Sequence, residues 1–121
     1  MIHRAIACSM VMLLTACATI PDSPAGIDAQ YQAANPPKYP AQAIRQHHSG
    51  TSTVLVEVGA DGLVHDVRIS QSSGYRELDQ AAIAAAYAWR YKARILSGHP
   101  AMAYLRIPVN FHLNDFTPVL K

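Results

Sequence analysis

The strictest constraint on the fold is an alternation of apolar and polar residues near the C-terminus. Every second position is apolar at Ala103, Leu105, Ile107, Val109, Phe111 and Leu113, and the positions between are Tyr104, Arg106, Pro108, Asn110 and His112. A period of two is typical of a β-strand with one buried face and one wet face. Pro108 has no N–H to donate to a ladder, so this strand is expected to lie at the edge of an antiparallel sheet.

Two more strands are expected upstream. The valines at 54, 56 and 58 share one face of a strand over residues 53–58. The turn signal Ala60-Asp61-Gly62 then leads into a second strand over residues 63–70. So short a connection favours antiparallel pairing.

One long and one short helix complete the expected fold. A single apolar stripe runs along residues 77–91, formed by Leu78, Ala82, Ala85 and Trp89. A shorter helix is expected to open at Pro40 and run to Arg45, with Gly50 as the residue that ends or turns it. The sequence therefore predicts an α+β fold: a three-stranded antiparallel sheet with one long helix packed on one face and a short N-terminal helix.

The first residues have the order of a secretory signal peptide: a basic start, the apolar run 5–14 and then small residues. Leu14-Thr15-Ala16-Cys17 resembles a lipobox, where bacterial lipoproteins are cleaved just before an acylated cysteine. We expect residues 1–16 to be the signal peptide and Cys17 to be lipidated. An uncleaved membrane anchor is the alternative. A membrane span needs about 20 apolar residues, and the uncharged run over residues 5–20 is shorter than that.

The remaining segments follow from composition. Residues 17–36 hold only isolated apolar residues, so a flexible lipid-anchored tether is expected there. Roughly 18 extended residues reach at most about 60 Å. The folded domain is expected over residues 37–115, followed by a C-terminal tail over 116–121. In bacterial lipoproteins the residue after the lipidated cysteine influences sorting between the two membranes. Here that residue is Ala18 and not aspartate, which favours the outer membrane.

Charge and residue types argue against several classes of function. The net charge of +2 leaves no electrostatic footprint for nucleic acid. His47 and His48 are adjacent and the other histidines are scattered, so no metal site and no cofactor are expected. Ser72 and Ser73 precede a helix, where serine is an ordinary cap, and no Gly-x-Ser-x-Gly elbow occurs. The chain is not expected to be an enzyme.

Short motifs occur in a fixed order between Pro37 and Leu113. They are Tyr39-Pro40 with Ala43, Gly50, Asp61-Gly62, Ser72-Ser73-Gly74, Leu78-Asp79, Ala82, Trp89-Arg90-Tyr91, Gly98-His99-Pro100, Pro108 and Phe111. Together they resemble the TonB C-terminal domain family. The resemblance implies that the last strand captures a short extended segment of an outer-membrane transporter by strand addition. Its expected peptide-binding residues here are Tyr104, Arg106, Pro108 and Asn110.

The energy transducers of that family also have an N-terminal membrane helix and a long proline-rich spacer, and neither is expected in this chain. We therefore expect a noncatalytic envelope lipoprotein on the periplasmic side of the outer membrane. It would bind an extended peptide or an envelope protein, and peptidoglycan is another partner to consider. Two alternatives are a TonB-type transducer with an uncleaved N-terminal anchor, and a structural subunit that forms a homodimer through the same edge.

Overall fold

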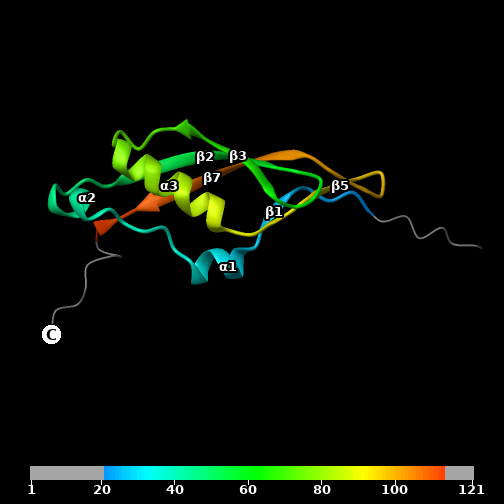
Figure 1. The fold of residues 1–121 in the computed structure, drawn as a ribbon, viewed down its shortest axis with the longest axis horizontal. Helices are drawn as coiled ribbons and strands as arrows, with labels where there is room; N and C mark the ends of the chain where they lie inside the picture. Colours follow the sequence, from blue (N-terminus) through cyan, green and yellow to red (C-terminus); the bar gives the residue numbers. More distant parts are fainter. Residues whose placement is uncertain (1–20, 114–121) are drawn as a thin grey trace, which may run out of the picture.

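The computed structural model describes residues 21–113 (Figure 1). Its centre is a three-stranded antiparallel sheet of order β3-β2-β7, formed by β2 (Gly50–Val58), β3 (Val64–Gln71) and β7 (Ala103–Phe111). Helix α3 (Arg76–Ala88) lies across one face of this sheet. The predicted α+β fold is confirmed, and β7 lies at the edge where Pro108 led us to expect it.

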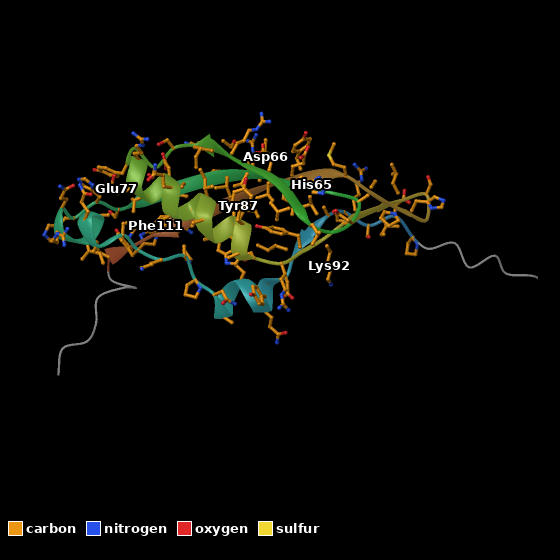
Figure 2. The ribbon with its side chains drawn as sticks, viewed as in Figure 1. His65, Asp66, Glu77, Tyr87, Lys92 and Phe111 are labelled. Carbon is orange, nitrogen blue, oxygen red and sulfur yellow. The ribbon has the colours of Figure 1, made fainter. Side chains whose placement is uncertain are left out.

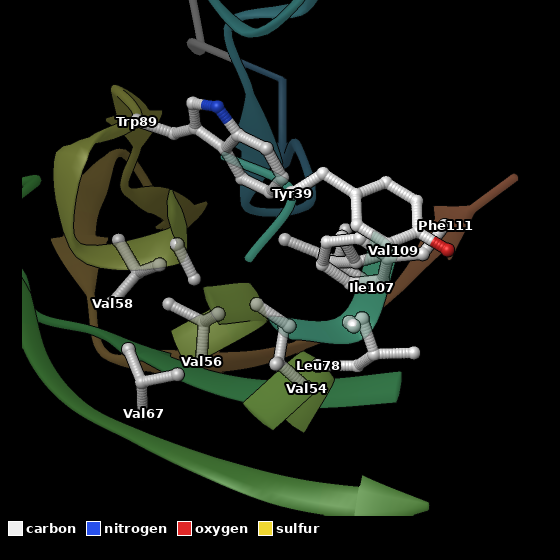
Figure 3. Packing of buried hydrophobic residues seen from close by; sticks show 13 residues of the cluster. Tyr39, Val54, Val56, Val58, Val67, Leu78, Trp89, Ile107, Val109 and Phe111 are labelled. Carbon is white, nitrogen blue, oxygen red and sulfur yellow. The ribbon is translucent and has the colours of Figure 1, made fainter. Parts of the chain in front are cut away.

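The core lies between α3 and the sheet (Figure 3). The three valines predicted to share a face of β2 are all fully buried, as are Leu78 and Ala82 of α3. Ala86 rather than Ala85 completes the buried stripe of the helix. At one end Tyr39 meets the edge of Phe111, with ring centroids 5.5 Å apart and planes at 84°.

The short helix α2 (Ala41–Arg45) forms where it was predicted, with Pro40 as its N-cap. It ends differently from the expectation. The left-handed position after the helix is taken by His47, at φ 56°, not by Gly50, which opens β2. His48 N–H donates to Ala43 O at 2.8 Å and His47 N–H to Ile44 O at 3.2 Å. This pair of bonds is a Schellman motif, which satisfies carbonyls that the helix end leaves free.

Helix α3 stops before the predicted end at residue 91. Trp89 is its C-cap and has an extended backbone, at φ −73° and ψ 164°. The chain then forms the short strand β4 (Tyr91–Lys92), which pairs antiparallel with β1 (Gly26–Ile27). A strand partner from the N-terminal side therefore takes the place of a last helical turn.

Residues 22–36, which we call the strap, are folded against the domain. They contain β1 and helix α1 (Ala29–Ala34), whose N-cap Asp28 accepts a bond from Tyr31 N–H at 3.0 Å. The prediction of a flexible tether over residues 17–36 is therefore wrong for the strap. Its two larger apolar side chains, Ile27 and Tyr31, pack against the core. Backbone pairing of β1 with β4 also holds the strap on the domain.

A small hairpin also lies outside the predicted elements. Strands β5 (Arg94–Leu96) and β6 (His99–Ala101) are joined by a two-residue turn. Ser97 and Gly98 both have positive φ, at 52° and 78°, which is the backbone of a type I′ turn.

The predicted lipidation site Cys17 lies outside the described residues. Within residues 21–113, the helices are too short or too polar to cross a membrane.

Candidate docking edge of the sheet

Strand β7 is paired on one side only. Its nine residues match the nine of β2 from Gly50↔Phe111 to Val58↔Ala103, without a register shift. Its other side has no strand beside it among the residues that the structure describes. A row of backbone donors and acceptors is therefore open to another chain.

Pro108 fixes which backbone groups face outward. It stands opposite Thr53 within the unbroken register, so we infer that its missing N–H falls on the free side. Backbone direction alternates along an antiparallel strand. The N–H and C=O groups of Tyr104, Arg106 and Asn110 then share that free side with the carbonyl of Pro108.

The side chains of these four residues lie on the wet face of the sheet, opposite α3. Tyr104 is 58% exposed, and its hydroxyl donates to Glu57 Oε1 at 3.2 Å. Thr51 Oγ1 donates to Asn110 Oδ1 at 2.7 Å. Arg106 is exposed and takes part in no ion pair within residues 21–113. The edge thus offers one unpaired cation between two side chains that β2 already orients.

The far edge of the same face is different. On β3, Arg68 Nε lies 2.5 Å from Asp66 Oδ2, and this pair raises the pKa of Arg68. Both side chains are accessible there, and Asp66 is labelled in Figure 2. The charge on β3 is therefore neutralised locally, whereas the charge on β7 is not.

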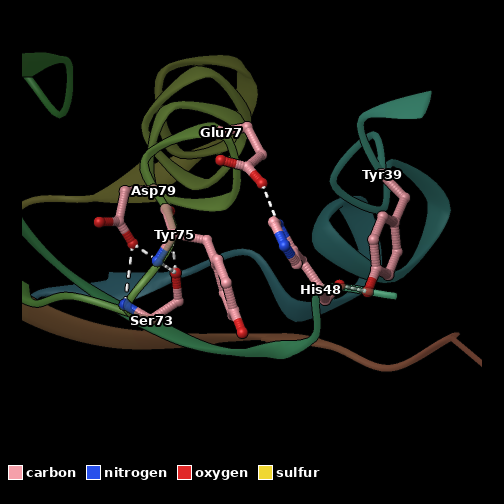
Figure 4. A network of polar contacts seen from close by, with 6 residues as sticks. All are labelled: Tyr39, His48, Ser73, Tyr75, Glu77 and Asp79. Atoms are coloured by element: carbon pink, nitrogen blue, oxygen red, sulfur yellow. Dashed lines mark hydrogen bonds and ion pairs between the residues drawn. The ribbon is translucent and has the colours of Figure 1, made fainter. Parts of the chain in front are cut away.

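A polar cluster missed by the sequence reading joins β2 to the start of α3 (Figure 4). Asp79 Oδ1 accepts bonds from the buried Ser52 hydroxyl at 2.7 Å, from Ser73 N–H at 2.9 Å and from the Ser73 hydroxyl at 2.8 Å. Ser72 Oγ donates to the other carboxylate oxygen. Burial acts to raise the pKa of Asp79, but these hydrogen bonds outweigh it and the pKa is lowered.

The serines therefore do not cap α3, whose N-cap is Tyr75 without a side-chain bond. They bind a carboxylate one turn into the helix instead. The serine pair and the acid were both visible in the sequence, but their contact with Ser52 depends on tertiary packing. We infer that this cluster stabilises the loop between β3 and α3.

His48 and Glu77 hold α2 against α3. The His48 ring stacks on Tyr75, with centroids 3.9 Å apart, and its Nδ1 lies 2.5 Å from Glu77 Oε1. The hydrogen bond from His48 lowers the pKa of Glu77. Tyr39 donates its hydroxyl proton to the backbone oxygen of His48 (Figure 4). His48 is thus a structural side chain, and no three metal-ligating side chains gather anywhere in residues 21–113.

Comparisons with known proteins agree with this fold. The chain is 41% identical over 93 residues to Protein TonB of Xanthomonas campestris pv. campestris, a match that covers 77% of this chain and 42% of that protein. Protein TonB of Vibrio cholerae is 34% identical over 92 residues, covering 76% of this chain and 36% of that protein. The chain thus spans less than half the length of these relatives.

The solution structure of the TonB C-terminal domain of Helicobacter pylori is similar in fold. It aligns with a TM-score of 0.50 and 24% identity, over 69% of this chain and 87% of that one. The family described as Gram-negative bacterial TonB protein C-terminal matches residues 35–113. Proteins of this family are noncatalytic and face the periplasm in the cell envelope. The chain therefore belongs to the TonB C-terminal family.

Proposed function

We propose that the domain binds an extended segment of an envelope protein by adding it as a fourth strand along β7. The observation that carries this proposal is a nine-residue strand paired on one side only. The inferred orientation of Pro108 toward the open side agrees with it. Strand addition of this kind takes affinity from backbone bonds and specificity from side chains. The family's association with outer-membrane receptors supports such a receptor as the partner.

Backbone pairing alone gives little affinity. Each hydrogen bond contributes about 0.5–1.5 kcal/mol net, and association costs at least about 4 kcal/mol of translational and rotational freedom. Since Pro108 supplies no donor, the wet-face side chains have to add the rest. Arg106 is suited to a carboxylate of the incoming segment, and Tyr104 offers an exposed ring.

We also propose that Cys17 is lipidated and that residues 1–16 are removed, which would hold the domain on the periplasmic side of the outer membrane. The support is the lipobox-like Leu14-Thr15-Ala16-Cys17 at the end of an apolar run. A peptide mass that carries the lipid on Cys17, together with precursor accumulation under globomycin, tests this proposal. An intact N-terminus in both measurements would refute it.

A second candidate function is a TonB-type energy transducer that keeps its N-terminus as a membrane anchor. The similarity to proteins named TonB favours it. The docking edge is common to both candidates, and only the N-terminus differs. The globomycin experiment therefore separates them without touching the edge.

The docking edge is tested by crosslinking in the intact envelope. A photoreactive amino acid at Tyr104 should crosslink to one discrete partner, through residues that mass spectrometry maps to an extended segment. The same group at Ser70, on the opposite edge strand, is the control. Equal labelling from both positions would contradict docking at β7.

Charge reversal supplies a matched pair of variants. Arg106→Glu should abolish the crosslink or weaken it strongly, because the unpaired cation becomes an anion. Arg68→Glu puts the same change on the same face of the sheet, on β3, and should leave the crosslink intact. Recovery of the same partner in equal amount from both variants would count against the role of Arg106.

A further inference from the structure

We propose that the β5–β6 hairpin lies against the surface of the bilayer that holds the N-terminus. This inference rests on the membrane attachment proposed above, and it applies to a lipid anchor and to a membrane helix alike. It adds an orientation: one end of the domain faces the lipid and the other points away.

The hairpin is fastened to the point where the described chain begins. Asp22 Oδ1 accepts a bond from Ser97 N–H at 2.8 Å. Ser23 and Ile95 exchange two backbone bonds, of 3.0 and 2.9 Å. The hairpin therefore cannot move away from Asp22 without breaking these contacts.

The folded strap makes the link to the membrane short. Only residues 18–21 lie between Cys17 and Asp22, and four residues reach at most about 14 Å. A membrane helix that ends near Ile20 would bring Asp22 closer still. Either anchor therefore holds the hairpin next to the lipid headgroups.

The composition of this end suits a bilayer surface. Leu96 is 43% exposed and Met102 49% exposed, and together with Tyr104 they make up half of the large apolar side chains exposed on the described domain. Lys92 and Arg94 are exposed and belong to no ion pair within residues 21–113. Apolar side chains beside free cations match an interface rich in anionic lipid.

Asp22 and Glu57 are the acids nearby, and they keep their negative charges while they accept hydrogen bonds from Ser97 N–H and the Tyr104 hydroxyl. Within residues 21–113, neither of them forms an ion pair with Lys92 or Arg94. Figure 1 shows the hairpin and the start of the strap at one end of the long axis and α2 at the other. In the proposed orientation β7 starts near the lipid at Ala103 and leads away from it to Phe111. A segment rising from a transporter in the same membrane would meet Tyr104 first.

The test uses the full chain, purified with its native anchor and reconstituted in vesicles of phosphatidylethanolamine and phosphatidylglycerol with a headgroup-quencher lipid. The sequence has two cysteines, Cys8 and Cys17, and an acylated Cys17 has no free thiol to label. In a Cys8→Ser background, His99→Cys therefore places a fluorophore on the hairpin. Arg45→Cys places the same fluorophore on α2, at the opposite end. We expect several-fold stronger quenching at position 99 than at position 45. Leu96→Glu should reduce that difference while the protein still floats with the vesicles.

The two proposals fail in distinguishable ways. If the protein floats with the vesicles but both fluorophores are quenched equally, the membrane attachment stands and the contact of the hairpin is refuted. If the protein does not float at all, the proposed attachment is wrong and the contact falls with it. The mass of the Cys17 peptide shows which anchor was present.

Discussion

His47 occupies a backbone conformation that most side chains avoid. At φ 56° its Cβ is crowded, yet the Schellman bonds after α2 require a left-handed residue there. Glycine has no Cβ, so His47→Gly should raise the free energy of unfolding by about 0.5–1 kcal/mol. Urea denaturation measures the change. His47→Ala removes the imidazole but keeps the crowding and should bring no gain, and an equal gain from both variants would contradict the backbone explanation.

Trp89 is a buried core residue that also contacts the strap. It is 4% exposed, and its Nε1 donates to Asn35 O at 2.7 Å. Trp89→Ala should lower the free energy of unfolding by about 3–5 kcal/mol, a large part of the 5–15 kcal/mol typical of a domain. Tyr87→Ala is the control, because Tyr87 lies on the same helix and is 51% exposed. A thermal midpoint for Trp89→Ala within a few degrees of wild type would contradict the prediction.

Asp79 makes stability depend on pH in a defined direction. Burial would raise its pKa, but the bonds from Ser72, Ser73 and Ser52 outweigh it, so its pKa in the folded state lies below the ordinary 3.8. A lowered pKa contributes stability that is present above the ordinary value and lost as pH falls through the folded value. The domain should therefore lose stability on acidification below about pH 4.

Asp79→Asn should be less stable than wild type at pH 7, by about 1 kcal/mol or somewhat more, for the hydrogen bonds lost at a half-buried site. It should also show a smaller further loss between pH 5 and pH 3, because it has no carboxylate to protonate there. Asp66→Asn, at the accessible pair with Arg68, should keep the dependence of wild type. Urea titrations at each pH measure both effects, and parallel curves for Asp79→Asn and wild type would refute the assignment.

At the scale of elements, the sequence predicts those parts whose side chains repeat with a period. The valines of β2, the alternation of β7 and the alanine-rich stripe of α3 each show one, and all three elements form. Pro108 adds the position of β7 at the edge. These features are local, so one chain segment carries all the information for each.

The strap and the small strands could not be found in the same way. Strand β1 has two residues and β4 has two, too few to show a period. Their pairing joins positions that lie far apart in the chain, Gly26 with Lys92. The clusters around Asp79 and His48 were missed for the same reason, because each joins residues from separate elements.

The strap should carry measurable stability. A fragment of residues 37–121 lacks the side chains of Ile27 and Tyr31 and the Asn35 carbonyl that accepts from Trp89. We expect it to unfold with about 2–4 kcal/mol less free energy than a fragment of residues 22–121, the scale of one or two buried apolar side chains. Urea denaturation of both fragments measures the difference. A fragment of residues 18–121 serves as the control and should match 22–121, and equal midpoints for 37–121 and 22–121 would show that the strap adds nothing.

At the scale of the whole molecule, the free edge of β7 could also pair with a second copy of itself. Such a dimer has a two-fold axis, so its strands run antiparallel and each position meets its mirror position. An axis at Ile107 places each Pro108 opposite Arg106 and loses a donor in both copies. An axis at Arg106 sets the two arginines against each other, and like charges directly opposed are destabilising. The sequence of β7 therefore disfavours self-pairing in these two central registers while leaving the edge open to another sequence.

The fragment of residues 22–121 should accordingly stay monomeric through the micromolar range, as measured by light scattering at increasing concentration. A double variant Arg106→Thr with Pro108→Thr removes both obstacles and should dimerise more readily than wild type, because all outward backbone groups of β7 can then pair. Arg68→Thr on β3 is the control and should remain monomeric. A wild-type fragment with twice the monomer mass, converted to monomer by Arg106→Glu, would make the edge a homodimer interface and would displace the docking of an envelope partner as its function.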